Sequence, residues 1–416
     1  MKARFRYRLY PHPGQQVLLA KTFGCARVVY NDGLRLRNEA YDRGEPYLND
    51  TELQKRVITQ AKQTVERRWL AEVSVDALIQ SLRDLHTAFK HFFDSVAGRR
   101  QGAKIGPPRF KNKTDKQAIR FTRNGFSVHS NCVYIAKVGH IPLAWSRPLP
   151  SVPSSATVIK DKAGRYFVSF VCEVQATPLP QRQQVVGIDL GLQTFATMSD
   201  GNKQDNPRIF RKLERKLGRL QRSLSCKAKG SKNRGKQRLK VARLHARIAD
   251  KRADFLHKLS TQLLHENQVV VVEDLCVKGL GRTWLAKSFH DAGFGKFVSM
   301  LEAKALKYGR ELVKVGRSFA SSQICSNCQH KDGPKPLWVR RWRCPECKSE
   351  HDRDENAAKN ILAQGLGERS GGLFQRPLNA CGASVRPLAT KAAGNEAGTH
   401  PKQRQKCRCE KESARL

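Results

Sequence analysis

The chain has 416 residues, of which 39% are hydrophobic and 27% charged, so it can bury ordinary cores and is not wholly disordered. Its 78 Lys and Arg exceed its 36 Asp and Glu by 42, and this excess predicts a nucleic-acid partner, because cations that neutralise phosphates release counterions. A ribosome-like or membrane-surface protein is the alternative. No run of about 20 apolar residues suggests a membrane span, and the opening MKARFRYRLYPHPG lacks the apolar core of a secretory signal.

The first part of the chain shows strand, helix and strand patterns in turn. Residues 3–10 alternate basic with apolar or aromatic side chains, which predicts a strand. A helical pattern follows from residue 15 to about 97, with apolar side chains at three- and four-residue intervals between 78 and 89. Short strand patterns return between 119 and 174, separated by Pro and Gly. We therefore predict a small β domain that carries a helical insertion.

A second unit begins near residue 185 and combines buried strands with amphipathic helices. Residues 185–191, VVGIDLG, predict a buried strand that ends at an acid, and residues 194–198 predict its hairpin partner. Between 211 and 258 there are 18 Lys and Arg against 3 acids, a net charge of +15. This predicted helical pair is either a solvated hairpin or a positive wall along a polynucleotide, and the sign bias favours the wall. Further elements are predicted as a buried strand over 269–272, a helix over 294–308 and a strand over 311–315.

Two C-x-x-C pairs, 15 residues apart, stand out among the twelve cysteines. Their members are Cys325, Cys328, Cys344 and Cys347. Four thiolates at this spacing can converge tetrahedrally on one zinc ion with no open position, which is typical of a structural zinc ribbon. Gln329 and Lys348 stand where such turns normally have Gly, and we expect them to strain the turns. The other cysteines are scattered and indicate a reducing cytoplasm rather than a disulfide framework.

Three acids stand at the ends of predicted elements. Asp189 ends a strand in GIDLG, Glu273 ends another in VVVVEDL, and Asp354 begins a helix in DRDENAA. Acids at the ends of buried strands are costly without a cation, and three that converge can hold two Mg²⁺ ions for phosphodiester hydrolysis. The GIDLG segment also resembles the first phosphate motif of actin-like ATPases and sugar kinases, and by itself it leaves both interpretations open. Neighbouring acids that we expect to cap helices or turns are Asp200, Asp274 and Asp352.

The order of these motifs resembles that of one known family. The segments GIDLGLQTFATMSDG, VVVVEDLCVKGL and SFHDAGFGKFVSMLEAKALKYGREL, followed by the cysteine pairs and HDRDENAAKNIL, are similar to the RuvC-like nuclease and zinc ribbon of the TnpB (OrfB) family. These proteins are transposon-encoded and similar to the type V CRISPR effectors. YPHPGQQVLLAKTFGCARVVYNDGL and GPPRFKNK extend the resemblance toward the N-terminus, so it spans roughly residues 3–365.

The resemblance implies a fold and a set of site residues. The fold is an α/β RNase H-like (RuvC) nuclease domain with an inserted zinc ribbon, plus a small β-barrel wedge domain with a helical recognition insertion. Asp189, Glu273 and Asp354 match the catalytic, Mg²⁺-binding acids, and the four paired cysteines match the zinc ligands. The implied boundaries are 1–13 for the first wedge strand, 14–100 for the insertion, 101–178 for the wedge barrel, 185–320 for the nuclease with its basic hairpin at 211–265, 321–350 for the ribbon, 351–368 for the last nuclease helix and 369–416 for a basic, disordered tail.

The resemblance also implies an activity and its partners. The expected function is an RNA-guided, Mg²⁺-dependent DNA endonuclease associated with a transposon, in the prokaryotic cytoplasm at the nucleoid. A guide RNA made from the transposon end would pair with one strand of double-stranded DNA beside a short motif, and both strands would be cut. An RNA–DNA heteroduplex is recognised by shape and backbone charge, which requires a wide basic channel and fits a net charge of +42.

Other functions stay open on the sequence alone. A nucleic-acid-binding regulator that does not cleave would also be basic, although three intact acids argue against it. A DNA-joining transposase would need a Tyr or Ser nucleophile motif, and none is clear. A transposase accessory protein is a further alternative. An ATP-dependent kinase would need a second phosphate motif and would leave the cysteine pairs unexplained. The sequence does not specify the target-adjacent motif, the guide sequence or the oligomeric state.

Overall fold

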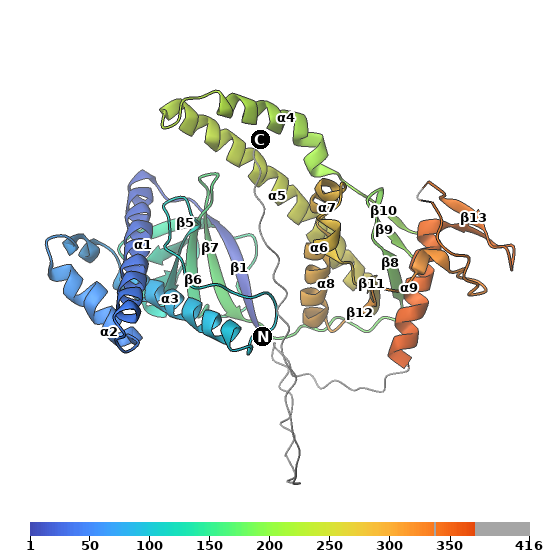
Figure 1. Cartoon of the computed structure of the whole chain (residues 1–416), viewed down its shortest axis with the longest axis horizontal. Coiled ribbons are helices and arrows are strands. Elements are labelled where there is room, and N and C mark those ends of the chain that lie inside the picture. The colour runs from blue at the N-terminus through green and yellow to red at the C-terminus, as the bar shows by residue number, and fades with distance from the viewer. Residues whose placement is uncertain (337, 371–416) are drawn as a thin grey trace, which may run out of the picture. The chain divides into compact units, whose positions relative to one another are not determined.

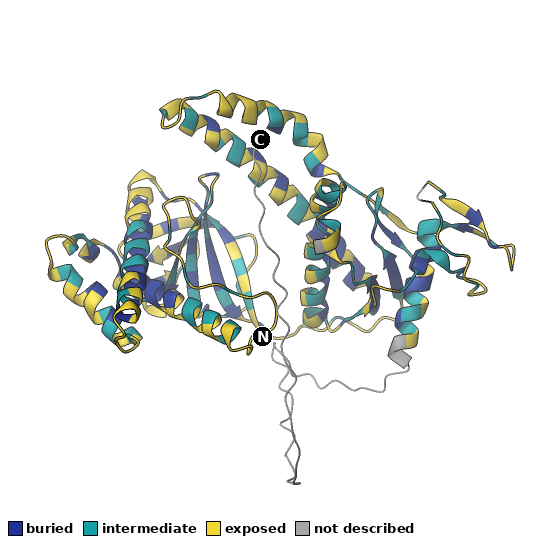
Figure 2. Ribbon diagram, in the orientation of Figure 1, coloured by how far each residue is buried: buried dark blue, intermediate teal, exposed yellow. Residues whose placement is uncertain are grey.

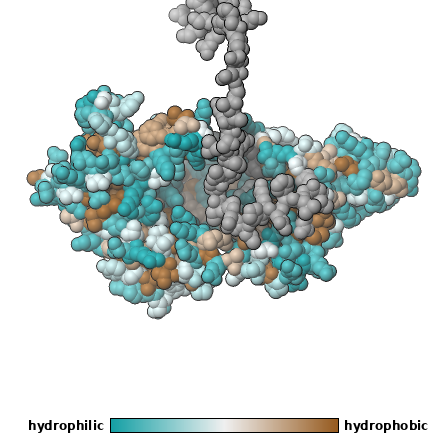
Figure 3. Space-filling model, turned by 90° about the horizontal axis from the view of Figure 1, so that it is seen from below, coloured by the Kyte–Doolittle hydropathy of each residue, from teal (hydrophilic) through white to brown (hydrophobic). Residues whose placement is uncertain are grey.

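The computed structural model describes residues 1–336 and 338–370. The predicted tail at 369–416 lies outside the described residues, except that the last helix continues to Ser370. No helix in the described ranges is both long and apolar enough to cross a bilayer. On the face shown in Figure 3, hydrophilic residues predominate and apolar residues form scattered small patches.

The N-terminal part of the chain contains a seven-stranded antiparallel sheet with the order β2-β6-β7-β1-β5-β4-β3 (Figure 1). Its strands are β1 Lys2–Leu9, β2 Gln117–Thr122, β3 Phe126–Val128, β4 Cys132–Ile135, β5 Gly139–Ala144, β6 Ser155–Lys160 and β7 Tyr166–Glu173. Strand β1 pairs with β7 along its whole length, from Lys2 opposite Glu173 to Leu9 opposite Tyr166. The described residues contain no pairing between the end strands β2 and β3, so the ladder stays open there.

One hydrophobic core covers the inner face of this sheet. The alternation in β1 directs Tyr7 and Leu9 inward, where they are 2% and 1% exposed, and its arginines outward. The Tyr7 ring lies 4.8 Å from Trp145 and 5.9 Å from Phe170, between ring centroids. Phe23 on the first helix belongs to the same core, so the inserted helices are packed onto the sheet and are not a separate unit.

The insertion between β1 and β2 is helical, as predicted. Its helices are α1 Pro13–Asp42, α2 Asp50–Gln54 and α3 Val75–Val96, and its short turns are η1 Lys55–Gln60, η2 Ala61–Gln63 and η3 Arg68–Glu72. A further turn, η4 Arg123–Gly125, joins β2 to β3. His12 and Gln15 form a capping box at the start of α1, each side chain bonding the other's backbone N–H. Helices α1 and α3 pack together, and a Cβ at Gly33 would approach Leu82 to 2.9 Å.

The C-terminal part of the chain is a mixed α/β sheet with helices on both faces (Figure 1). Its strand order is β10-β9-β8-β11-β12. The parallel strands are β8 Val185–Asp189, β11 Val269–Glu273 and β12 Glu311–Val315, and the antiparallel strands are β9 Thr194–Met198 and β10 Lys203–Asp205. The helices are α4 Ile209–Ser225, α5 Lys232–Glu266, α6 Val277–Leu280, α7 Ala286–Ala292, α8 Phe294–Tyr308 and α9 Arg353–Ser370. The mixed α/β architecture agrees with the sequence-based prediction.

The four valines of β11 pack against helices on both faces of the sheet. Val270 and Val272 pack in the cluster that contains α5 and α8, whereas Val269 and Val271 pack in the cluster that contains α9. All four are at most 1% exposed. A parallel strand covered on both faces needs apolar side chains at every position, which explains the uninterrupted valine run.

Helices α4 and α5 form the basic hairpin predicted at 211–265. They pack against each other along a narrow apolar seam that includes Leu217, Leu244 and Ile248. Figure 2 shows that most of the remaining hairpin surface is exposed. The basic side chains on it are therefore available to an anionic partner.

Gly187 provides a test of the packing between β8 and α9. A Cβ at this position would lie 2.3 Å from the carbonyl oxygen of Ala358, a backbone atom that cannot move aside. We expect Gly187→Ala to lower the free energy of unfolding by about 1–3 kcal/mol through overpacking. Gly218→Ala in α4 is the control, because nothing lies within 4 Å of its Cβ, and it should be neutral or stabilising. Urea denaturation measures both, and equal midpoints would contradict the close approach.

Candidate active site and zinc ribbon

The pairing of β8 with β11 brings two of the predicted acids to one edge of the sheet. Ile188 lies opposite Val272 in this parallel pair, so Asp189 and Glu273 occupy the next position on each strand. Asp354 stands in the first turn of α9, which packs across β8. Parallel strands present their carboxyl ends at the same edge, where ligands bind in α/β sheets.

The electrostatics of the site are those of neighbouring carboxyl groups. Burial, followed by the charges of Glu273 and Asp354, raises the pKa of Asp189 from 3.8 to about 7. The guanidinium groups of Arg353 and Arg340 act in the opposite direction without cancelling this rise. Burial and neighbouring negative charge make a carboxyl group hard to ionise, and a divalent cation beside it stabilises the ionised form. Carboxylate oxygens are ligands that suit Mg²⁺. The three acids therefore fit a magnesium site.

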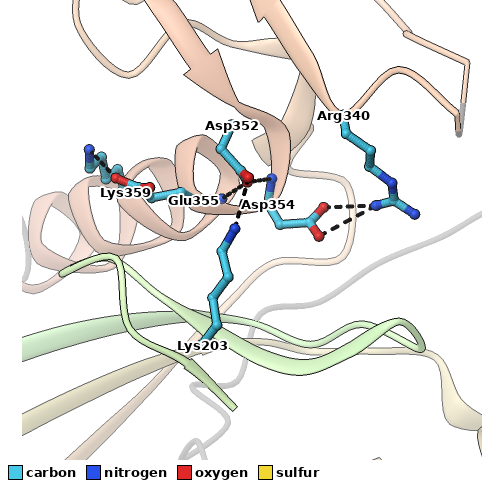
Figure 4. A network of polar contacts seen from close by, with 6 residues as sticks. All are labelled: Lys203, Arg340, Asp352, Asp354, Glu355 and Lys359. Atoms are coloured by element: carbon cyan, nitrogen blue, oxygen red, sulfur yellow. Dashed lines mark hydrogen bonds and ion pairs between the residues drawn. The ribbon is translucent and has the colours of Figure 1, made fainter. Parts of the chain in front are cut away.

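The carboxylate oxygens of the three acids nevertheless do not all lie within ligand distance of one common ion. In the described part of the chain, only the four paired cysteines form a set whose ligand atoms all lie within 4.8 Å of one another. Arg340, from the segment between the two cysteine pairs, contacts both carboxylate oxygens of Asp354, at 3.2 and 3.4 Å (Figure 4). Two-metal sites keep their ions about 3.5–4 Å apart, so their ligands need not all be mutual neighbours. Cation binding by Asp354 would have to displace or share this arginine.

The N-terminus of α9 is held by the acid that we expected to be a cap. Asp352 Oδ1 accepts hydrogen bonds from the backbone N–H groups of Asp354 and Glu355, both at 3.1 Å, which confirms the capping role. Lys203 donates to Asp352 Oδ2 at 2.8 Å (Figure 4). Burial alone would raise the pKa of Asp352, but the contact with Lys203 and the backbone donors hold it below its ordinary value. The first turn of α9, with Asp354 in it, is thus fixed in place.

The two other neighbouring acids differ from each other. Asp200 accepts from the backbone N–H of Asn202 at 3.0 Å and stabilises a turn, as expected. Asp274 instead forms an ion pair with Arg317, with a separation of 2.8 Å. The expected capping role of Asp274 is replaced by an ion pair because a cation from the end of β12 lies within reach.

The four paired cysteines converge as their spacing predicts. Cys325 and Cys347 have Sγ atoms 3.6 Å apart, as do Cys328 and Cys344. In a tetrahedral four-thiolate zinc site with Zn–S bonds of about 2.3 Å, two sulfur atoms are separated by close to this distance. The set therefore fits one zinc ion, and all four cysteines are free of disulfides.

The two non-glycine turns adopt the conformation that Gly would favour. Gln329 has φ 62° and Lys348 has φ 60°, both left-handed. In each turn the backbone N–H donates to the carbonyl of the first cysteine of its pair, Cys325 or Cys344. The left-handed backbone conformation costs a residue with a side chain about 1–2 kcal/mol of conformational free energy. The expected strain in the two turns is therefore confirmed, and the surrounding structure must hold them in this conformation.

Sequence reasoning misses the residues that connect the cysteine-bearing segment to the acids. Arg340 stands out in the sequence only as one of several cations near the second cysteine pair, and Ser321 does not stand out at all. Ser321 Oγ donates to Glu273 Oε1 at 2.6 Å and opposes the rise in pKa that burial causes at Glu273. No sequence pattern signals either contact, because each joins residues from different elements.

Comparisons with known proteins agree with the motif order. Three family models match this chain: "Probable transposase" of the OrfB_IS605 type over residues 169–283, "Cas12f1-like, TNB domain" over 294–361 and "Helix-turn-helix domain" of the OrfB_IS605 type over 1–46. A Streptomyces pristinaespiralis protein named "Putative RNA-guided DNA endonuclease" is 43% identical over 395 residues, covering 93% of this chain and 92% of the relative. The chain belongs to the TnpB (OrfB) family. Another relative in this family, InsQ of Escherichia coli (strain K12), carries the same description and is 30% identical over 379 residues, covering 87% and 92%.

A solved structure extends the comparison to the fold of this TnpB-family protein. The protein chain in the "Cryo-EM structure of the Cas12f1-sgRNA-target DNA complex" aligns with a TM-score of 0.52 and 12% identity, covering 87% of this chain and 98% of the other. At this identity the likeness shows the fold alone. The segment matched by the helix-turn-helix model is here a strand, Lys2–Leu9, and one continuous helix, Pro13–Asp42.

The raised pKa of Asp189 predicts a pH-dependent stability. An unfolded Asp ionises at about pH 4, whereas folded Asp189 keeps its proton to about pH 7. The folded state therefore binds more protons between these values, and its free energy of unfolding falls as the pH rises through this window. Asp189→Asn cannot ionise, so without added Mg²⁺ or Mn²⁺ it should be roughly 1–3 kcal/mol more stable than wild type at pH 8 and less so at pH 5.

Thermal unfolding at both pH values checks this prediction. Asp254→Asn is the matched control, since that carboxylate is 63% exposed and pairs with Lys258 on the same helix face. A stabilisation by Asp189→Asn that is the same at pH 5 and pH 8 would show that Asp189 ionises normally.

Proposed function

We propose that this protein is an RNA-guided, Mg²⁺-dependent DNA endonuclease associated with a transposon. The observation that carries the proposal is the meeting of Asp189, Glu273 and Asp354 at one edge of an α/β sheet, with the pKa of Asp189 raised by burial and by the other two. Family relatives that are 43% and 30% identical over nearly their whole length are named RNA-guided DNA endonucleases, without mention of a metal. A cluster of acids of this kind has no evident use in a protein that only binds nucleic acid.

The proposed chemistry assigns a role to each group around the acids. Asp189, Glu273 and Asp354 would hold two Mg²⁺ ions, which when bound supply an activated water and stabilise the leaving oxygen of a phosphodiester. Glu273 is oriented by its hydrogen bond from Ser321. Arg340 would release Asp354 and could then face the substrate phosphate. The N-terminal turn of α9 also favours anions at this position through its dipole.

The remaining parts of the chain supply binding and support. A guide RNA derived from the transposon end and double-stranded DNA with an adjacent short motif are the proposed partners, contacted through backbone charge. The sheet of β1–β7 would be the wedge domain and the helices between β1 and β2 the recognition insertion, with the boundaries predicted from sequence. The four cysteines would hold a structural zinc ion in a ribbon that contains β13 Arg341–Arg343 and β14 Glu350–Asp352. The proposed DNA substrate implies action at the prokaryotic nucleoid.

Removal of one acid tests the catalytic assignment. Purified protein with its RNA, a matching duplex and Mg²⁺ should cut both strands. Asp189→Ala should lower the cleavage rate to below roughly 1% of wild type, because a metal ligand is removed, while guided DNA binding stays within about threefold. Asp254→Ala should behave as wild type. Binding without product in the wild type would favour the non-cleaving regulator, and loss of binding with retained cutting would contradict the role of Asp189.

The basic hairpin can be tested separately. Lys236, Lys240 and Arg243 are exposed on α5, and replacing all three by Gln should weaken RNA and DNA binding for every sequence. The slope of log K against log salt should become shallower by about 0.7–0.9 for each phosphate that the variant no longer neutralises. The matched control replaces both lysines by Arg and keeps Arg243, so charge is retained and binding should equal wild type. An unchanged salt slope in the Gln variant would exclude the hairpin as a phosphate-binding surface.

A further inference from the structure

A short segment with buried ends connects the zinc ribbon to the acid cluster. It begins with the turn η5 Ser321–Gln323 and continues through Ile324 into the first cysteine pair. Asn360 of α9 donates from Nδ2 to the carbonyl oxygens of Ser321 and Ile324, at 2.8 and 2.6 Å. One amide therefore holds the backbone of the segment at both ends of its turn.

A second asparagine of α9 binds the same segment one turn earlier. Asn356 Nδ2 donates to the carbonyl oxygen of Ile324 at 2.7 Å, and its Oδ1 accepts from the backbone N–H of Ser326 at 2.8 Å. Asn356 and Asn360 are each 2% exposed. The buried Nδ2 groups of both amides find their acceptors in this segment, while Asn360 Oδ1 has no partner in the described residues. Losing these acceptors would leave buried donors unpaired, so the bonds fix the segment against α9, the helix that carries Asp354.

The other side of the segment reaches the second acid. Ser321 is 6% exposed, and its hydroxyl donates to Glu273 Oε1 at 2.6 Å. Glu273 at the end of β11 and Asp354 at the start of α9 are thus tied to one stretch of backbone from opposite sides. A hydrogen bond that orients a metal-binding carboxylate typically changes metal affinity by about 10- to 100-fold when it is removed.

The conformation of this segment depends on the cysteine cluster. Cys325 belongs to the segment, is fully buried, and has its Sγ 3.6 Å from that of Cys347. The turn that follows is closed by left-handed Gln329, a strained conformation. A backbone hydrogen bond from Gln329 to the carbonyl of Cys325 closes this turn. Four thiolates repel one another without a cation, so a zinc ion bound by the four cysteines would hold the turn in this conformation.

We infer that Ser321 is a positioning residue through which zinc binding at the four cysteines fixes Glu273, so that zinc and the divalent cation at the acids bind cooperatively. The inference rests on the proposed function, since it requires cation binding by Asp189, Glu273 and Asp354. Coupling between two sites is reciprocal: whatever factor zinc adds to the affinity of the acids, a cation at the acids adds to zinc. A ribbon that only stabilised the fold would couple the two sites without needing the Ser321 hydroxyl.

Mn²⁺ binding to the full-length, zinc-loaded protein tests the first half of the inference. Electron paramagnetic resonance titration should reveal a Mn²⁺ site that Asp189→Ala removes. Ser321→Ala should weaken this site about tenfold while zinc content and circular dichroism stay at wild-type values. Ser321→Thr keeps the hydroxyl and should restore affinity. Ser322→Ala, one position along the same turn, is the matched control and should bind Mn²⁺ as wild type does.

Zinc release tests the second half and does not depend on nuclease activity. The equilibrium fraction of zinc transferred to a chromogenic chelator should fall severalfold in wild type when Mn²⁺ is saturating. In Ser321→Ala this fraction should no longer respond to Mn²⁺, because the link to Glu273 is gone. Correct folding of that variant is established by its circular dichroism, and Ser321→Thr should regain the response.

The outcomes separate this inference from the proposed function. A wild-type protein with no Mn²⁺ site sensitive to Asp189→Ala would overturn the proposed metal-dependent nuclease and the inference with it. A sensitive site that Ser321→Ala leaves unchanged, or zinc release that ignores Mn²⁺ in wild type, would overturn the inference alone. Equal weakening of Mn²⁺ binding in Ser321→Ala and Ser322→Ala would assign the effect to the turn as a whole and would also overturn the role of Ser321.

Discussion

Electrostatic repulsion among three carboxyl groups at one sheet edge is the constraint on which the rest of the site depends. Asp189 and Glu273 are neighbours because parallel strands are hydrogen-bonded in register, and neither strand can shift without breaking that ladder. Burial, and then this repulsion, raises the pKa of Asp189 to about 7. A fold that maintains such repulsion holds a site where a doubly charged cation gains most of its binding energy from charges that are already in place.

The scaffold around this edge is correspondingly tight. Val269–Val272 are buried on both faces of β11, and Gly187 lets α9 pass close to β8. Asp352 caps α9 and is itself held by Lys203, so Asp354 cannot move far from the edge. The ion pair between Arg340 and Asp354 is looser, because the Arg340 side chain is 46% exposed and can exchange for another cation at small cost.

Positive charge elsewhere in the chain serves a different purpose. The helices α4 and α5 bury only a narrow apolar seam against each other. The same amphipathic pattern that packs the hairpin therefore leaves its basic side chains exposed. Attraction of a polyanion over a long range depends on the density of positive charge and not on the exact position of each side chain. Acids that hold metal ions must instead be positioned to within about one bond length. The two requirements are met by separate elements, an exposed hairpin and a doubly covered sheet.

The sequence by itself determined the strand and helix order of the C-terminal unit, the convergence of the cysteines and the choice of candidate acids. Each of these features follows from a local sequence pattern, such as the valine run of β11, the spacing of the C-x-x-C pairs, or an acid that comes directly after a buried strand. Only the tertiary structure decided that Asp274 pairs with Arg317, that Arg340 reaches Asp354 and that Ser321 orients Glu273. Those contacts join residues on different elements, and the distance between them depends on how whole helices and strands pack, which no local pattern encodes.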